Sequence, residues 1–175
     1  MLFTWFEILD ILITVVAGSF IFSGLVEVIK KRETLAERLL LSAAIVGPSI
    51  ILHELGHKFA ALSLGLQATF HASYLWLAIG VVLKLVSFPF IFLVPAYVSI
   101  IGTATPMEFA WTAFAGPMVN GILFLVCFIL LKARSWSMDT TILLHASQNI
   151  NLFLFVFNLI PIPGFDGAKV WGAFF

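Results

Sequence analysis

Charged side chains are scarce in this chain. Nine of its 175 residues are lysine or arginine and nine are aspartate or glutamate, so charged residues make up 10% and the formal net charge is zero. An average soluble domain carries about 25% charged residues. The low charge therefore excludes an ordinary soluble domain, and the lack of a basic patch excludes a nucleic-acid partner.

Cysteine is nearly absent as well. Cys127 is the single cysteine, which excludes an intrachain disulfide and a zinc site built from cysteine thiolates. It lies in an apolar run, and we expect it to be chemically inert core. A basic segment at the N-terminus is also missing, since the first residues carry Glu7 and Asp10 instead. We therefore expect a retained membrane span there and not a cleaved signal peptide.

Hydrophobic residues, by contrast, are abundant, at 62% of the chain with a mean hydropathy of +1.13. These values indicate an integral, multi-pass protein of the cell membrane. Four runs are long enough to cross a bilayer as helices, namely Phe3–Val28, Leu39–Leu64, Glu108–Leu131 and Thr140–Ile160. We therefore predict an all-α transmembrane helix bundle that forms a single domain over residues 1–175.

The segment between the second and third of these runs is ambiguous. Residues 74–101 are apolar, but Lys84, Pro89 and Pro95 interrupt them. One broken span, two short spans, or a dip into the membrane with some extended structure all fit this pattern. Val94–Ile101 is rich in β-branched and aromatic residues, which favours a short membrane-associated β-strand there.

A metal-binding pattern lies within the second run. His53, Glu54 and His57 form the sequence H-E-x-x-H. Residues four apart on a helix share one face, so both imidazoles can reach one zinc ion. Glu54 can then take a proton from the water that zinc activates. The pattern also arises by chance on solvated helices. In hydrocarbon, however, two histidines, a glutamate and Lys58 are costly unless they have a function.

A catalytic zinc ion needs a third protein ligand, and Asp166 is the best candidate. Pro161 and Pro163 must end the last helical run, because proline lacks a backbone N–H and disfavours helix at the preceding residue. Asp166 follows on this unwound stretch, where a carboxylate is costly without a cation. The alternatives are that Asp166 caps the next helix, or that His71 or His145 completes a three-histidine site.

The run Thr140–Ile160 carries many polar side chains for a membrane span. Asn151 and Asn158 are seven residues apart and share a helix face, which should point into the bundle because amides in lipid need partners. We expect this face to line the route of water to the site. His145 lies on the same run, which leads to Asp166, and we expect it to contact a zinc ligand rather than the zinc itself.

Three segments together resemble the site-2 protease family of intramembrane zinc metalloproteases. They are H-E-L-G-H at residues 53–57, A-G-P at residues 115–117 with Asn120, and N-L-I-P-I-P-G-F-D-G at residues 158–167. The family pattern is H-E-x-x-H on one span and N-x-x-P-x-P-x-x-D-G on a later one, and the two together are highly specific. The chain is most similar to archaeal members without a PDZ or regulatory domain. It departs from many members in having Gly164-Phe165 where they have proline-leucine.

The resemblance implies hydrolysis of peptide bonds in or next to transmembrane segments of membrane-protein substrates, as in regulated intramembrane proteolysis. The implied roles are one zinc ion per chain bound by His53, His57 and Asp166, water activation by Glu54, and positioning of the substrate or of the zinc-binding segment by Asn120 and Asn158. The expected partners are such substrates and the lipid bilayer. Assembly into a homo-oligomer is left open.

Two rival functions use the same residues. A membrane transporter or sensor could bind a transition metal without hydrolysis, and Glu54 would then be a ligand or idle. A di-iron carboxylate site is a further alternative, because Glu54 and His57 form a Glu-x-x-His pair. Such a site needs a second pair of this kind, and the chain has none, so we disfavour it.

Overall fold

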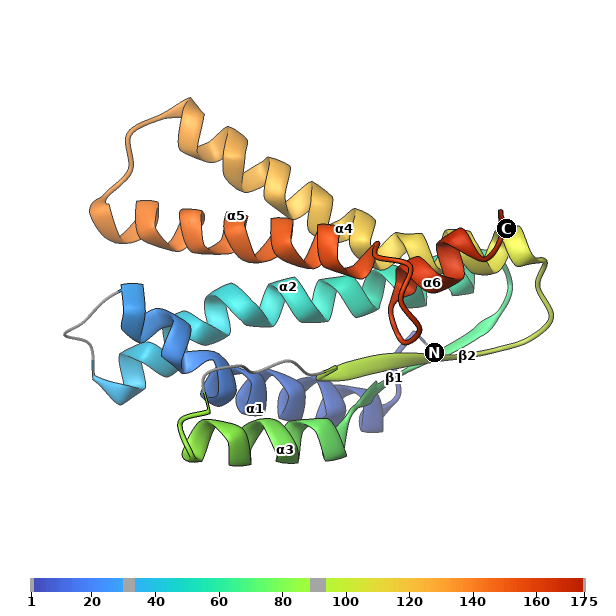
Figure 1. Ribbon diagram of the computed structural model, residues 1–175, viewed down its shortest axis with the longest axis horizontal. Coiled ribbons are helices and arrows are strands. Elements are labelled where there is room, and N and C mark those ends of the chain that lie inside the picture. Colours follow the sequence, from blue (N-terminus) through green and yellow to red (C-terminus); the bar gives the residue numbers. More distant parts are fainter. Residues whose placement is uncertain (1, 30–33, 89–93, 175) are drawn as a thin grey trace. The chain divides into compact units, whose positions relative to one another are not determined.

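The computed structural model describes residues 2–29, 34–88 and 94–174 (Figure 1). Its elements, in chain order, are α1 (Trp5–Ile29), α2 (Leu35–Ser63), β1 (Gln67–Ala72), α3 (Tyr74–Leu85), β2 (Ala96–Ile101), α4 (Pro106–Ala133), α5 (Met138–Asn158) and α6 (Asp166–Trp171). Among the described residues, α1, α2, α4 and α5 are long and apolar enough to cross a membrane. The predicted fold class, an all-α polytopic membrane protein, is therefore confirmed.

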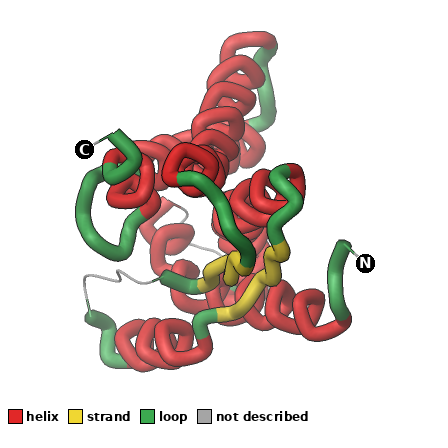
Figure 2. The backbone as a smooth tube through the Cα atoms, turned by 90° about the vertical axis from the view of Figure 1, so that its right-hand side faces the viewer, coloured by secondary structure: helices red, strands yellow, loops and turns green. Residues whose placement is uncertain are grey.

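The ambiguous segment contains both extended and helical structure. β1 and β2 pair as a two-stranded sheet, which Figure 2 shows in yellow. The strand expected within Val94–Ile101 is therefore present as β2. Between the two strands, α3 has 12 residues, which is too short to cross a bilayer at 1.5 Å per residue. Residues 89–93, where Pro89 was expected to interrupt a span, lie outside the described residues.

The start of α2 corrects one predicted boundary. The predicted span begins at Leu39, with the charged residues 30–38 before it as a connector between spans, but the helix already begins at Leu35. The reason is a capping box, in which the N–H of Glu37 donates to Thr34 Oγ1 at 3.3 Å and the N–H of Thr34 donates to Glu37 Oε2 at 2.8 Å. Residues 30–33 of the connector lie outside the described residues. Gly65 follows the end of the helix, with a φ of +77° that favours glycine.

The chain forms two compact units, which we describe separately. The N-terminal unit comprises residues 1–51 and 70–97, and the C-terminal unit comprises residues 52–69 and 98–175. Helix α2 and both strands pass from one unit into the other. The motif at residues 53–57 and the segment that carries Asp166 both belong to the C-terminal unit.

In the N-terminal unit, α3 packs against α1 around a buried core formed by Ile21, Ala72 and Leu77. Helix α1 also buries two carboxyl groups, those of Glu7 and Asp10. The N–H of Phe70 in β1 donates to Glu7 Oε1 at 2.8 Å, and the hydroxyl of Tyr74 donates to Asp10. Buried carboxylates in a membrane span need such partners, and these bonds attach β1 and the start of α3 to α1.

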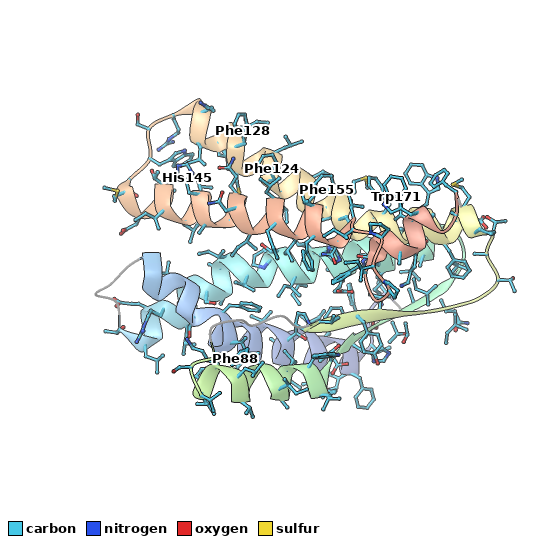
Figure 3. All side chains as sticks on the ribbon, viewed as in Figure 1. Phe88, Phe124, Phe128, His145, Phe155 and Trp171 are labelled. Carbon is cyan, nitrogen blue, oxygen red and sulfur yellow. The ribbon has the colours of Figure 1, made fainter. Side chains whose placement is uncertain are left out.

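In the C-terminal unit, α4 packs along α5 and α6 packs against α4 (Figure 1). The ring of Phe155 on α5 lies against Gly121 on α4 (Figure 3). The second half of α2 approaches α4 so closely that a Cβ at Gly56 would lie 2.8 Å from the carbonyl oxygen of Ala115. Lys58 is buried and donates to the carbonyl oxygen of Ala68 at 3.0 Å, which ties β1 to the helix that carries the motif.

Candidate metal centre

Three predicted ligand atoms converge in the C-terminal unit. His53 and His57 lie one turn apart on α2, and Asp166 is the first residue of α6. The two Nε2 atoms are 3.1 Å apart, and each lies 3.2 Å from Asp166 Oδ2. Among the described residues, these three form the group of histidine, cysteine and acidic side chains that could hold a metal ion. The fold thus brings Asp166 to a motif more than a hundred residues earlier in the chain.

The dimensions of this triangle suit a zinc ion. Zinc binds nitrogen and oxygen ligands at about 2.0–2.2 Å, so two ligand atoms of a tetrahedral site lie about 3.3–3.5 Å apart. The observed separations of 3.1–3.2 Å are only slightly shorter. Three protein ligands with the fourth position left for water or substrate is the arrangement of a catalytic zinc site.

The hydrogen bonds of the two histidines also suit a metal. His57 Nδ1 lies 2.8 Å from the carbonyl oxygen of Thr112 on α4. A carbonyl oxygen only accepts, so Nδ1 carries the hydrogen and Nε2 keeps its lone pair for a metal. His53 Nδ1 lies 2.6 Å from Oδ1 of Asn120 and is held in the same tautomer. Two nitrogen lone pairs and a carboxylate oxygen then face one another, and a cation relieves their repulsion.

The chain places Asp166 through the segment between α5 and α6. This segment is not helical, as its two prolines predict. Phe165 is the cap residue of α6 and makes no side-chain capping bond, so Asp166 does not have the capping role that was the alternative. The indole N–H of Trp171 donates to the carbonyl oxygen of Leu159 at 3.0 Å. The ring of Phe165 packs edge-on against Phe157, with centroids 4.8 Å apart. These contacts fold the segment back so that Asp166 faces the histidines.

The surroundings of Asp166 favour its ionised form. In the metal-free protein, burial of the carboxyl raises its pKa, but protonation of the His53 and His57 imidazoles would supply hydrogen bonds and positive charge that lower it further, so the pKa lies below its ordinary value. The group is therefore a carboxylate at neutral pH, which is the form that binds a metal.

The backbone of α4 lies directly against the two imidazoles. A Cβ at Gly116 would lie 2.8 Å from His53 Nε2 and closer still to His57 Nε2. Any side chain at this position would displace the ligands. From the sequence, Gly116 was recognised only as part of the family resemblance, and this close packing is the physical reason for a glycine there. Thr112 was missed altogether, because it contributes a backbone carbonyl and every residue type has one.

Glu54, the predicted base, is buried on α2. It directly follows the ligand His53 on α2 and lies close enough to Asp166 and Lys169 of α6 to interact with them electrostatically. Lys169, an exposed residue of α6, was not singled out from the sequence.

The three predicted asparagines differ in the groups to which they are hydrogen-bonded. Asn120 and Asn151 are both buried, and Nδ2 of Asn120 donates to Oδ1 of Asn151 at 2.9 Å, so both belong to the surroundings of His53. Asn158 is the last residue of α5, and its Nδ2 donates to the carbonyl oxygen of Leu154 at 3.0 Å. Its role in positioning substrate stays a prediction.

The structure does not bring His145 beside the ligands. His145 is exposed, and Figure 3 shows it near the opposite end of α5 from Trp171 of α6. It precedes Asn151 by six residues, which is about 9 Å along a helix. Its expected contact with a zinc ligand is therefore not supported. His71 lies in the N-terminal unit, where its Nδ1 is 3.7 Å from Asp10 Oδ2 and its ring lies against Tyr97.

Comparison with known proteins adds one relative. Over 171 residues the chain is 39% identical to a protein of Methanocaldococcus jannaschii named "Putative zinc metalloprotease MJ0611", and the match covers 96% of this chain and 85% of the relative. No family model matches the chain, and no solved structure matches it significantly. With this identity over nearly its whole length, the chain belongs to the zinc metalloprotease family of its archaeal relative.

Proposed function

We propose that this protein is an intramembrane zinc endopeptidase of the site-2 protease type, which cuts membrane-protein substrates in or next to a transmembrane segment. The observation that carries the proposal is the triangle of His53, His57 and Asp166, with two of its corners on a helix long enough to cross a membrane. Family membership supports zinc-dependent proteolysis. The combined motifs at residues 53–57 and 158–167 support the site-2 type and a place in the cell membrane.

The residues have distinct roles in this reaction. His53, His57 and Asp166 would hold one zinc ion, which when bound polarises the scissile carbonyl and lowers the pKa of water to about 7. Glu54 takes the proton of the attacking water and later delivers it to the leaving amine. Its burial keeps bulk water from competing for that proton.

The substrate must expose its backbone before it can be cut, because a helix hides its carbonyl groups in internal hydrogen bonds. An unwound segment can instead add as a strand to an open sheet edge. On β1 the N–H of Phe70 already donates to Glu7, so the outer edge of that strand is occupied there. We therefore assign the substrate to β2, whose residues 98–101 belong to the same unit as the ligands.

Replacement of the base tests this function. Glu54→Gln removes the proton acceptor but leaves the three ligands in place. The purified variant should keep about one equivalent of zinc per chain and should lose at least about 100-fold in cleavage of a substrate with a single transmembrane helix, because general acid–base catalysis contributes roughly 10²–10⁴-fold. Zinc is measured by elemental analysis and cleavage by gel or mass spectrometry.

Glu37→Gln is the matched control. Glu37 is exposed and lies in the capping box of α2, where glutamine also serves. This variant should keep both zinc and activity. A protein that binds zinc and moves it across vesicle membranes equally well with and without Glu54→Gln, and that cuts nothing, would be a metal transporter and would contradict the proposal.

A further inference from the structure

The two candidate histidine ligands are oriented by different means. His57 Nδ1 donates to the backbone carbonyl of Thr112 at 2.8 Å, and a backbone oxygen cannot turn into a donor. His53 Nδ1 faces the side-chain amide of Asn120 at 2.6 Å. An amide can present either its oxygen or its nitrogen. Something else must therefore decide which end of Asn120 faces His53.

The side-chain amide of Asn151 fixes the orientation of the Asn120 amide. Oδ1 of Asn151 on α5 accepts a hydrogen bond from Nδ2 of Asn120 at 2.9 Å. Nδ2 of Asn151 in turn donates to the carbonyl oxygen of Ser147 at 2.8 Å. Because that carbonyl only accepts, it holds the nitrogen of Asn151 toward itself and the oxygen toward Asn120. Both asparagine side chains are almost fully buried, at 0% and 2% exposure, so solvent does not compete for these bonds.

Reversal of this chain of bonds would disable the ligand. If Asn120 turned over, its nitrogen would face His53 Nδ1, which could then only accept. The hydrogen of the imidazole would move to Nε2, and Nε2 would lose the lone pair that binds a metal. Partners that orient a metal-binding histidine typically change metal affinity by about 10–100-fold.

We propose that Asn151 is a positioning residue of the metal centre, which acts through Asn120 to keep the lone pair of His53 Nε2 available for the metal. The relay runs from the Ser147 carbonyl through two amides to the imidazole, and it couples α5 and α4 to the ligand helix α2. This inference rests on the zinc site of the proposed function. Asn151 then helps to orient a metal ligand, whereas its helix face had suggested that it lines the route of water to the site.

Two substitutions at one position separate the relay from simple packing. Asn151→Leu has a similar size but can neither accept from Asn120 nor donate to Ser147. Asn151→Asp still accepts from Asn120, and in its neutral form it also donates its hydroxyl to the Ser147 carbonyl. If the relay matters, Asn151→Leu should weaken zinc binding more than Asn151→Asp does. If only packing matters, Asn151→Asp should weaken it more, because leucine is the better packing substitute in an apolar interior. Asn149→Leu is the matched control, since Asn149 is exposed on the same helix.

Zinc affinity is measured by competition with a chelator on the full-length protein in detergent. We expect Asn151→Leu to raise the Kd for zinc at least about tenfold, and Asn151→Asp and Asn149→Leu to stay within about threefold of the unchanged protein. In zinc-loaded protein with ¹⁵N-labelled histidine, Asn151→Leu should speed hydrogen exchange at Nδ1 of His53 and leave Nδ1 of His57 unchanged.

An unchanged Kd in Asn151→Leu would overturn the relay. So would a Kd raised more than tenfold in Asn151→Asp, and this second result decides the matter even if the leucine variant fails to fold. If the unchanged protein binds no zinc, the proposed function itself is wrong. If it binds zinc and Asn151→Leu binds it equally well, only the relay is wrong.

Discussion

At the scale of single residues, Asp166 is the group on which the candidate site most depends. Without it, the two histidines would leave a zinc ion with too few protein ligands for a catalytic site. Its carboxylate lies 3.2 Å from each Nε2, and no cysteine can replace it, since Cys127 lies on α4 and is the single cysteine.

Removal of the Asp166 charge is therefore expected to disable the site. Asp166→Asn keeps the shape of the side chain but replaces the anionic ligand by a neutral amide. Zinc affinity should fall by more than about 100-fold, since loss of an orienting partner alone costs 10–100-fold, and cleavage should be abolished while the protein still inserts into membranes. Elemental analysis after dialysis measures the bound zinc.

The controls for this prediction are Asp139→Asn, His145→Ala and His71→Ala. Asp139 is exposed in the first turn of α5, and neither histidine is placed among the three ligand atoms. All three variants should retain one zinc ion per chain. Loss of zinc in either histidine variant, together with its retention in Asp166→Asn, would mean that the third ligand is an imidazole.

Most of the ligand set could be predicted from the sequence, but the groups that orient the histidine ligands could not. The spacing of His53 and His57 implies a shared helix face, and the prolines before Asp166 imply an unwound segment. The contact between Asn120 and Asn151 joins residues on two different helices, and nothing in their spacing reveals it. The bond from His57 to Thr112 uses a backbone oxygen, which leaves no trace in residue type.

At the scale of secondary-structure elements, the segment between α5 and α6 determines where Asp166 lies. The indole N–H of Trp171 holds its two ends together by donating to the carbonyl oxygen of Leu159 at 3.0 Å. Aromatic packing of Phe165 against Phe157 supports the same turn. The segment leads directly into Asp166, the first residue of the short helix α6, so its local contacts should affect the metal directly.

Trp171→Phe tests this dependence. The change keeps an aromatic ring and removes the N–H, which should cost about 0.5–1.5 kcal/mol and weaken zinc binding by about 2–10-fold. Trp111→Phe is the control, because Trp111 is 60% exposed on α4, and it should leave the Kd for zinc unchanged. Equal Kd values for both variants and the unchanged protein would show that the indole bond does not position Asp166.

The elements themselves were predictable to different degrees. The long apolar runs predicted α1, α4 and α5 to within a few residues, because in a membrane length and hydropathy nearly determine a helix. The first turn of α2 was missed because its charged residues suggested a loop, although Thr34 and Glu37 carry the spacing of a capping box. In residues 66–106, short apolar segments fit strand and helix equally well, and tertiary contacts such as the bond from Phe70 to Glu7 decide between them.

At the scale of the whole molecule, the candidate zinc site is built on helices that can cross a membrane. The ligands lie on α2 and α6, and their orienting groups lie on α4 and α5, so nearly every element of the C-terminal unit contributes to the centre. A zinc protease built in this way should reach peptide bonds that lie within the bilayer.

The position of the cut in a substrate is the most direct test of this claim. The purified protein is placed in liposomes with a substrate that has one transmembrane helix, and the masses of the products locate the broken bond. We predict a cut within or next to the apolar segment, dependent on zinc and absent in Glu54→Gln. Products cut only in a distant soluble region, or no products from a zinc-loaded protein, would contradict the account.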